Sequence, residues 1–442
     1  MPSRRLSLTL YNALLPIGLL FMAPAALVKM RRRNGRWQDF GQRFGFFAPS
    51  KRAAIASLPL DDRIWMHAVS VGEVGVARKL IAALLKHSPS QGIVLTTTTP
   101  TGYRLAEEIE QAFPGHVAAL YSPLDLPGVA RRMLDELRPR RIVLVEAEVW
   151  PNTVSQAVSA GIPVTLVNAR LSPRSERSYL KYRSLIAPIF QMLDRVCVQE
   201  PEDVARWTAL GVDPQRITFT GSVKYDPQGS APDALQVQHF EELLRATGMA
   251  GRPLLLAAST HAGEEKELAL IYQEVATRHP GLGLLVVPRH YERGIAVQDE
   301  LQSIGLPSLL RSRLRDNPAR TDVFIIDSTG ELKAWQELAT IVIIGKSFLA
   351  EGGQNPAEAV MAGKPVVFGP HMENFIPLVS LLSSSKGAIQ VSGLERLSAV
   401  LDDLLTDSVK RDQLAQSGRA ALMRHDGATV RTVQALGVQV SK

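Results

Sequence analysis

The sequence contains a single cysteine, Cys197, so no disulfide can form within the chain. Its nine histidines show no metal-ligand spacing, which argues against a zinc site built by the protein. No G-x-x-x-x-G-K-[ST] sequence is present, because Gly345-Lys346-Ser347 lacks the upstream glycine of a P-loop. No G-x-G-x-x-G follows the first predicted strand, and no Asp-x-Asp pair is available for a nucleotide-bound metal. A phosphate leaving group would therefore need protein cations and helix ends, and we expect neither a metal nor a cofactor.

The length and composition indicate a folded protein of more than one domain. A chain of 442 residues is too long for one ordinary core, so two domains are expected. Hydrophobic residues make up 45% of the chain and charged residues 21%, a composition that is typical of a globular protein and argues against a large disordered part. The net charge of +7 favours an anionic partner, either nucleic acid, anionic lipid or a phosphorylated substrate.

The N-terminus carries a long uncharged run. Residues 6–28 lack charge and are numerous enough to cross a bilayer as a helix, although Asn12, Pro16 and Pro24 weaken the run. A cleaved signal peptide is the alternative, because residues 23–25 resemble a small-residue cleavage site. The basic residues that follow at once oppose export and keep the main body cytoplasmic. We therefore predict an uncleaved membrane anchor with a basic flank over residues 1–33.

Residues 30–47 interleave arginines with tryptophan and phenylalanine. This mixture is typical of a membrane interface, where rings lie at headgroup level and cations contact lipid phosphate. Nucleic acid could use the same mixture, but the adjoining apolar run favours lipid. We predict that this segment lies against a membrane surface with anionic lipids, and that the chain has no nucleic-acid partner.

Short apolar runs alternate with helical patterns along the rest of the chain, which predicts parallel sheets covered on both faces. Strands are expected at 64–69, 93–99, 118–122, 141–149, 163–168, 195–199 and 217–220, then at 254–259, 283–287, 323–327, 341–345, 365–368 and 387–391. A polar stretch at 226–238 is interpreted as a linker. The predicted fold is α/β, with Rossmann-like lobes at 34–225 and 226–442 facing a central cleft.

Four short blocks follow apolar runs and open apparent helices, at residues 67–73, 288–290, 328–331 and 352–358. Ligands of open α/β sheets bind beyond the carboxyl ends of the strands, so these blocks are candidate sites. Each also has an ordinary interpretation. Ser70 to Glu73 and Ser328 to Glu331 fit a capping box, and Asn355-Pro356 fits a cap followed by proline. Arg289 could pair with a phosphate or be a surface cation.

Two further segments carry charge at predicted strand ends. Glu146 and Glu148 would share one face of a strand, an unusual arrangement at the end of a buried one. Lys224 also follows a strand and could point into the same cleft, or be a solvated lysine. His67 is interpreted as a hydrogen-bonded scaffold of the site and not as a base.

The order of these motifs resembles the 3-deoxy-D-manno-octulosonic acid (Kdo) transferases of lipopolysaccharide synthesis. The resemblance covers the whole chain and rests on the N-terminal run and on residues 67–73, 98–102, 146–152, 168–172, 259–261, 288–293, 330–332 and 355–358. It implies a metal-independent, inverting glycosyltransferase of the GT-B type. Such enzymes move Kdo from CMP-Kdo to the lipid A precursor lipid IVA at the cytoplasmic face of the inner membrane.

The resemblance also implies roles for individual residues. Glu73 would be the general base, and Glu146 and Lys224 would stabilise the transition state. The first lobe would lie on the acceptor side, and the second would bind the donor. The residues implied to bind CMP are Pro288, Arg289, Thr329, Gly330, Glu331, Asn355, Pro356, Ala357 and Glu358.

The chain departs from the family at one point and leaves two rival functions open. The family usually has Gly-Gly-Ser where this chain has Gly345-Lys346-Ser347, so Lys346 adds either a phosphate contact or an outward-pointing cation. One rival is another two-lobe sugar-nucleotide enzyme, such as a UDP-sugar epimerase or lipid A disaccharide synthase. The other is a non-catalytic, membrane-tethered binding protein of the same fold.

Overall fold

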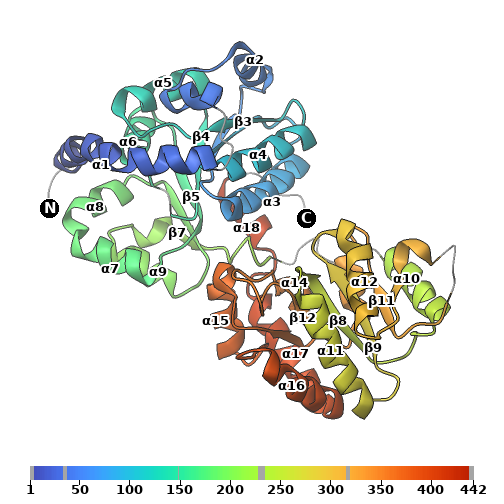
Figure 1. Cartoon of the computed structure of the whole chain (residues 1–442). Helices are drawn as coiled ribbons and strands as arrows, with labels where there is room; N and C mark the ends of the chain where they lie inside the picture. Colours follow the sequence, from blue (N-terminus) through green and yellow to red (C-terminus); the bar gives the residue numbers. More distant parts are fainter. Residues whose placement is uncertain (1–3, 33–36, 148, 227–233, 315–318, 438–442) are drawn as a thin grey trace. The chain divides into compact units, whose positions relative to one another are not determined.

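The computed structural model describes residues 4–32, 37–147, 149–226, 234–314 and 319–437. It divides into two compact units (Figure 1). Unit 1 runs up to Asp226 and resumes at Gly427, whereas unit 2 ends at Asp426. The predicted boundary near residue 226 agrees with this division. The prediction that the second lobe runs to residue 442 differs from it, because the last helix belongs to unit 1.

Unit 1 is built on a seven-stranded sheet in the order β3-β2-β1-β4-β5-β6-β7. All neighbouring strands are parallel, as their unbroken apolar runs predict. Each of the seven predicted strands is present. The strands are β1 (Ile64–His67), β2 (Ile93–Thr97), β3 (Val117–Tyr121), β4 (Arg141–Val145), β5 (Val164–Ala169), β6 (Arg195–Val198) and β7 (Ile217–Phe219). The strand order reverses between β1 and β4, and ligands of such sheets bind beside that point.

The helices of unit 1 cover both faces of this sheet. They are α1 (Arg4–Arg32), η1 (Trp37–Phe44), α2 (Pro49–Ser57), α3 (Val71–His87), α4 (Pro100–Ala112), α5 (Pro127–Leu137), α6 (Pro151–Ser159), α7 (Pro173–Lys181), α8 (Arg183–Phe190), α9 (Asp203–Ala209), η2 (Pro214–Arg216) and α18 (Ala428–Ala435). Two of them begin with a hydroxyl cap followed by proline, at Thr99-Pro100 and Ser172-Pro173, which fixes where these helices start.

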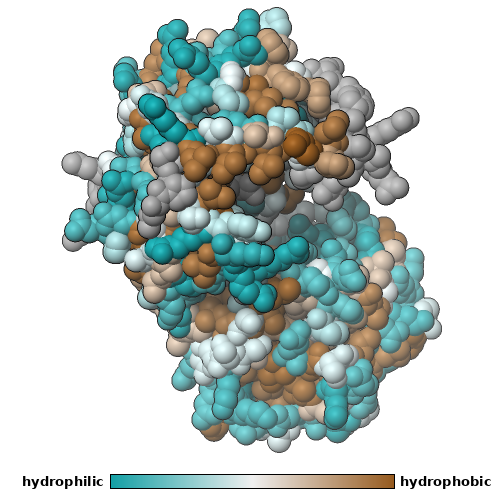
Figure 2. Space-filling view, turned by 90° about the vertical axis from the view of Figure 1, so that its left-hand side faces the viewer, coloured by the Kyte–Doolittle hydropathy of each residue, from teal (hydrophilic) through white to brown (hydrophobic). Residues whose placement is uncertain are grey.

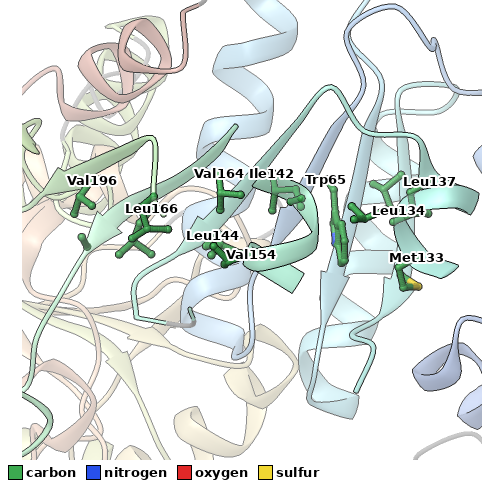
Figure 3. Close-up of a cluster of buried hydrophobic side chains, with 14 of the residues drawn as sticks. Trp65, Met133, Leu134, Leu137, Ile142, Leu144, Val154, Val164, Leu166 and Val196 are labelled. Atoms are coloured by element: carbon green, nitrogen blue, oxygen red, sulfur yellow. The ribbon is translucent and has the colours of Figure 1, made fainter. Parts of the chain in front are cut away.

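Alternate residues of the strands enter two separate cores. Trp65, Ile142 and Leu144 pack under α5 and α6 on one face (Figure 3). Ile64 and Val143 pack under α3 and α4 on the other. This alternation follows from the two-residue period of a strand. It fixes the sheet and therefore the positions of the residues that follow each strand.

The last helix completes the second of these cores. Val433 and Leu436 of the α18 segment are buried with residues of α3 and β1. At the start of the helix, the Asp226 carboxylate accepts hydrogen bonds from the backbone N–H of Gly427 at 3.0 Å and of Thr429 at 2.6 Å. Both points where the chain passes between the units are therefore tied together in unit 1.

Unit 2 repeats the architecture with a parallel sheet in the order β10-β11-β9-β8-β12-β13-β14. Its strands are β8 (Leu254–Thr260), β9 (Gly283–Pro288), β10 (Leu309–Leu310), β11 (Val323–Ile325), β12 (Ile341–Ile344), β13 (Val366–Phe368) and β14 (Ile389–Gln390). Six of these were predicted. The two-residue strand β10 was not, because so short a run carries no recognisable period. Here the order reverses between β8 and β12.

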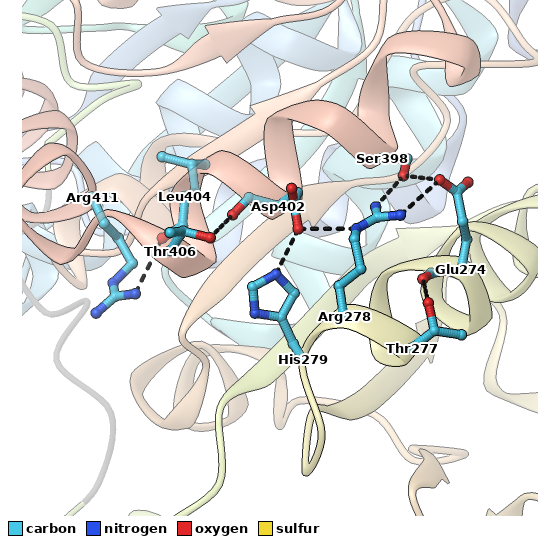
Figure 4. Close-up of polar contacts among 9 residues, drawn as sticks. All are labelled: Glu274, Thr277, Arg278, His279, Ser398, Asp402, Leu404, Thr406 and Arg411. Atoms are coloured by element: carbon cyan, nitrogen blue, oxygen red, sulfur yellow. Dashed lines mark hydrogen bonds and ion pairs between the residues drawn. The ribbon is translucent and has the colours of Figure 1, made fainter.

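The helices of unit 2 are α10 (Ala234–Thr247), α11 (Glu264–Arg278), η3 (Tyr291–Arg293), α12 (Gly294–Ser303), η4 (Arg311–Arg313), α13 (Leu332–Leu338), α14 (Ala357–Met361), η5 (Glu373–Phe375), α15 (Ile376–Ser384), α16 (Leu394–Thr406) and α17 (Ser408–Met423). An ion-pair network joins α11 to α16 (Figure 4). In it Asp402 accepts hydrogen bonds from Arg278 at 3.1 Å and from His279 at 2.7 Å. The network lies at the surface, where such pairs contribute little stability.

Helix α1 packs on unit 1 through polar side chains. Arg4 donates to the backbone oxygen and the hydroxyl of Ser155, both at 2.7 Å, and Asn12 exchanges hydrogen bonds with Asn152. A row of large apolar side chains faces outward, and Figure 2 shows an apolar band on this face of unit 1. The row consists of Leu6, Leu10, Leu14, Ile17, Leu20 and Phe21.

Among the residues that the structure describes, no helix combines the length and the apolar character needed to cross a membrane. This finding differs from the expectation that residues 6–28 could cross a bilayer, whereas the predicted anchor over residues 1–33 stays a prediction.

Three local predictions need correction. The strand predicted to reach residue 149 ends at Val145, so the argument that two glutamates share a strand face does not hold; Glu148 lies outside the described residues. The polar stretch predicted as a linker up to residue 238 is already helical from Ala234. Helix α13 begins at Leu332, with Glu331 as its N-cap and not Ser328.

Candidate active site

Glu73 lies in the first turn of α3, directly after β1. Ser70 is the N-cap, and its hydroxyl accepts a hydrogen bond from the Glu73 N–H at 3.4 Å. The Glu73 carboxylate accepts one from the Val69 N–H at 2.8 Å and one from the Ser70 hydroxyl at 3.0 Å. The predicted capping box is therefore present. The same contacts hold the carboxylate at the carboxyl end of β1, beside the switch point of the sheet.

His67, the last residue of β1, belongs to a buried hydrogen-bond network. Its Nε2 accepts from the Trp150 indole N–H at 3.1 Å, which places the proton on Nδ1. Nδ1 lies 3.0 Å from the Thr96 hydroxyl and 2.9 Å from that of Ser122. Burial lowers the pKa of His67 to about 4, so the ring is neutral. This agrees with its interpretation as a scaffold.

The neutral state of His67 predicts acid sensitivity. Because its pKa falls from 6.5 to about 4 on folding, the unfolded chain binds the proton first as the pH drops. Stability is then present above pH 6.5 and is lost toward pH 4, by about 2 kcal/mol between pH 7 and pH 5. We expect His67→Gln to remove most of this loss. Urea unfolding followed by tryptophan fluorescence at both pH values measures it, with His116→Gln as the control. An unchanged pH dependence in His67→Gln would contradict this assignment.

Glu146 follows β4 in a strained conformation. Its φ of +66° lies in the left-handed region, which non-glycine residues rarely occupy. The backbone is nevertheless held, since Glu146 N–H donates to the Val167 oxygen at 2.9 Å. Asn168, at the end of the neighbouring strand, also has a positive φ of 52°. Strain of this kind persists where the surrounding structure enforces it and is concentrated at functional sites.

Cations surround the Glu146 carboxylate. Burial raises its pKa, while the charges of Lys224 and Arg170 and the amide of Asn168 lower it. Burial in turn lowers the pKa of Lys224, and Glu146 opposes that effect. The structure thus brings together Glu146 and Lys224, two residues 78 positions apart that the sequence predicted to share a site. Buried Tyr225 joins them, with its pKa raised to about 12, mainly by burial.

The segment that carries Lys224 is held by the body of unit 1. Lys79 of α3 donates to the backbone oxygens of Val223, Lys224 and Asp226 at 3.1, 3.3 and 3.2 Å. The Val223 N–H donates to the Asn168 side-chain oxygen at 3.0 Å. Lys224 is therefore positioned from both sides.

In unit 2, Pro288 ends β9 and Arg289 follows it. The Arg289 N–H donates to the Thr260 oxygen at 2.9 Å, which ties the ends of β9 and β8 together. The Arg289 side chain is exposed, so its guanidinium is available to an anion. Beside it, the rings of His261 and His290 meet edge to face with centroids 6.0 Å apart.

Thr329, Gly330 and Glu331 follow β11, the other neighbour of β9. Thr329 and Gly330 are exposed, and a side chain at Gly330 would meet open space. The Glu331 carboxylate accepts a hydrogen bond from the Ser328 hydroxyl and forms an ion pair with Arg311 at 2.6 Å. Glu331 is therefore already paired, whereas the two residues before it are open to a ligand.

The segment from Asn355 to Glu358 begins α14. The Asn355 side-chain oxygen accepts from the Ala357 N–H at 3.1 Å, while buried Pro356 occupies the N-cap position that Asn355 was expected to hold. The Glu358 carboxylate lies 3.9 Å from the Lys333 ammonium, which places this segment beside the start of α13.

Gly352 and Gly353, the two glycines before that segment, are required by the packing of a neighbouring loop. A Cβ at Gly352 would lie 2.6 Å from Asn374 Nδ2, and one at Gly353 would lie 2.4 Å from Met372 Sδ. Both residues also have positive φ. Both glycines therefore make room for the neighbouring loop.

Comparison with known proteins decides the family. A family model for 3-deoxy-D-manno-octulosonic-acid transferase matches residues 38–227. The 3-deoxy-D-manno-octulosonic acid transferase of Bordetella pertussis is 35% identical over 92% of this chain and 94% of its own. That of Haemophilus influenzae is 31% identical over 95% of both chains. The chain belongs to the Kdo transferase family.

Solved structures support the architecture alone. A putative UDP-N-acetylglucosamine 2-epimerase from Listeria monocytogenes matches with a TM-score of 0.52 and 14% identity, over 85% of this chain and 95% of its own. The enzyme from Neisseria meningitidis gives the same TM-score at 12% identity, over 85% of this chain and 100% of its own. Both likenesses agree with two parallel-sheet α/β domains of the GT-B kind.

Sequence analysis of this Kdo transferase missed several residues of the candidate site. Arg170 and Asn168 lie beside Glu146, and His261 and His290 lie beside Arg289. All four fall inside motifs that carry the family resemblance, so that resemblance could have indicated them. The role of each of these residues could not be assigned from the sequence. Only the order of strands in the folded sheets places the end of β4 beside that of β5, and the end of β8 beside that of β9.

Proposed function

We propose that this enzyme transfers Kdo from CMP-Kdo to a lipid A precursor such as lipid IVA, with inversion and without a metal. The observation that carries the proposal is the cluster of Glu146, Lys224 and Arg170 at the carboxyl edge of the first sheet. Family membership supports the reaction type. The first unit then carries the acceptor-side chemistry and the second binds the donor.

Glu73 is the proposed general base. The acceptor hydroxyl has a pKa far above 7, so it needs a positioned base while it attacks the anomeric carbon. The Val69 N–H and the Ser70 hydroxyl orient the carboxylate, and the N-terminus of α3 stabilises its charge. The hydroxyl proton passes to Glu73 as the new bond to carbon forms.

The charge cluster around Glu146 is the proposed stabiliser of the transition state. Fixed charges in a partly buried site act without the reorganisation that water would require. The charges of Lys224 and Arg170 oppose the rise in the pKa of Glu146 that burial causes. Lys224 also offsets negative charge that develops on the leaving phosphate. This arrangement supplies protein cations where other transferases use a metal.

Product analysis tests the proposed function. Purified enzyme, CMP-Kdo and lipid IVA should give a product heavier by one or more Kdo residues in mass spectrometry. CMP should raise the melting temperature of the protein and UDP should not. This result would distinguish a CMP-Kdo enzyme from a UDP-sugar enzyme. Absence of any transfer in a single-turnover assay would leave the non-catalytic binding protein as the better interpretation.

Two substitutions in unit 2 test the donor site. Arg289→Ala should weaken CMP binding about tenfold or more, because a charge-assisted hydrogen bond contributes ~1.5–3 kcal/mol. Glu358→Ala should weaken CMP binding likewise with little loss of stability, since the ion pair between Glu358 and Lys333 is 3.9 Å long and half-exposed. Calorimetric titration beside melting curves measures both. A lower melting temperature with unchanged CMP affinity would reduce Glu358 to a helix-start residue.

The outward apolar row of α1 supports a location at the cytoplasmic face of the inner membrane. A helix with such a face lies in the lipid interface, and the arginines after it favour anionic headgroups. We expect Leu14→Asp/Leu20→Asp to release the enzyme from membranes while its fold is kept. Val409→Asp, at a similarly exposed position of α17, is the control. A chain starting near residue 36 should behave like the double variant.

Membrane binding of these variants is measured by fractionation after a salt wash. Transfer to acceptor dispersed in detergent should persist in both, because Glu73 and the donor site are unchanged. Transfer to acceptor in bilayers should fall, more so at high salt, which screens attraction to phosphate. Complete sedimentation of the truncated chain with membranes would show that α1 is not the main anchor.

A further inference from the structure

Lys346 has a strained backbone beside the switch point of the second sheet. It follows β12 with a φ of +54°, in the region that favours glycine. The neighbouring strand β8 contains a second such residue, Ser259, with a φ of +57° and a register shift. A Cβ at Gly345 would lie 2.6 Å from the Ser259 oxygen. The close approach of the two strand ends therefore requires Gly345 and forces the turn at Lys346.

The backbone N–H groups of this turn are already satisfied. The buried carboxylate of Glu264 accepts hydrogen bonds from Lys346, Ser347 and Phe348 at 2.6, 3.0 and 3.1 Å. The Glu264 carboxylate also accepts a hydrogen bond from the backbone N–H of His261 at 3.1 Å. Successive N–H groups in such a turn bind anions in many proteins, but here the protein supplies the anion itself. An external anion must therefore be bound by side chains.

The Lys346 ammonium is placed for that task. The side chain is half-buried, yet it makes no hydrogen bond or ion pair with the residues that the structure describes. Its Nζ lies 3.5 Å from where a Cβ of Gly352 would be. Burial and then the charge of Lys346 lower the pKa of His261, and the Nε2 atom of His261 lies 3.2 Å from Gln354 Nε2. A lysine without a carboxylate partner, held in a strained turn, would be an unexplained cost to stability.

We propose that Lys346 binds the phosphate of the CMP group and stabilises it as it leaves. This rests on the proposed function. In the transfer, the acceptor oxygen forms a bond to the anomeric carbon and the bond from that carbon to the phosphate oxygen breaks. The electron pair goes to the phosphate, which gains a negative charge, and the hydroxyl proton goes to Glu73. The Lys346 ammonium offsets that new charge.

The ratio of CMP affinity to cytidine affinity tests the proposal, because only CMP carries the phosphate. Lys346→Met should weaken CMP about tenfold or more and leave cytidine unchanged. Lys346→Arg should restore much of the loss. Lys364→Met is the matched control. Lys364 is also a half-buried lysine, but it precedes β13 and so lies at the amino ends of the strands, whereas the site lies at their carboxyl ends. This substitution should change neither affinity.

Stability and kinetics supply a second readout. Lys346→Gly relieves the backbone strain, so unit 2 should melt a few degrees higher while CMP binding falls. With CMP-Kdo as donor, Lys346→Met should lower kcat more than it raises KM, because the charge on the phosphate grows in the transition state.

Three results would overturn the proposal. They are unchanged CMP binding in Lys346→Met, equal losses for CMP and cytidine, and a loss confined to CMP-Kdo that assigns Lys346 to the Kdo carboxylate. Failure of the proposed donor would look different. Wild-type protein would then prefer UMP to CMP, and the ratio of UMP to uridine affinity would still decide the role of Lys346.

Discussion

Glu73→Gln is expected to lower Kdo transfer by ~10²-fold or more, because the amide cannot take the proton of the acceptor hydroxyl. Glutamine matches glutamate in size, and its side-chain oxygen can still accept the hydrogen bond from the Val69 N–H. The fold and the affinity for CMP should therefore be unchanged. Initial rates with saturating CMP-Kdo, beside calorimetric titration with CMP, measure both effects.

Ser70→Ala is the control that separates the base from the helix cap. It removes the hydroxyl that bonds to Glu73, which costs ~1 kcal/mol of stability, but it keeps the carboxylate. Most of the transfer activity should remain. Equal losses of activity in Ser70→Ala and Glu73→Gln would mean that Glu73 acts only as part of the helix start.

Lys224→Met is expected to lower transfer by ~10²-fold or more and to change its pH dependence. Lys224 lowers the pKa of the buried Glu146, so its removal raises that pKa further. At a given pH less Glu146 is then ionised. The acidic limb of the kcat/KM profile should therefore move to higher pH, whereas Lys224→Arg keeps a cation and should leave the limb in place.

The double variant Lys224→Met/Glu146→Gln tests whether the two residues act as a unit. If they do, its loss should be much smaller than the product of the single losses. A pH profile of Lys224→Met that coincides with the wild-type profile, or strictly multiplicative losses, would contradict the coupling of the two charges.

The sheets were predictable because their strands are buried on both faces. Runs such as Ile142 to Val145 are apolar throughout, and short unbroken runs of this kind, separated by helical patterns, are typical of parallel strands that are covered on both faces. The strand ends were less predictable. Nothing in the local sequence indicates that Glu146 leaves β4 with a positive φ, because that conformation is imposed by contacts with β5.

The candidate site was predictable residue by residue but not as an arrangement. Glu73, Lys224 and Arg289 follow apolar runs, and that position alone made them candidates. Whether a carboxylate such as that of Glu331 is free or paired depends on Arg311, which lies 20 positions earlier in the chain and is brought near by the fold. Family resemblance could supply such roles, whereas the spacing of residues could not.

The return of α18 to unit 1 determines the order in which the enzyme can mature on the ribosome. Unit 2 is formed by one continuous stretch that ends at Asp426, whereas unit 1 still lacks Val433 and Leu436 when that stretch is complete. The half that is synthesised first is therefore the last to close its core. Until residues 427–436 are synthesised, the carboxylate of Asp226 lacks the hydrogen bonds from Gly427 and Thr429, and the apolar surface beside α3 stays uncovered. Apolar surface exposed in this way makes an incomplete domain prone to aggregation.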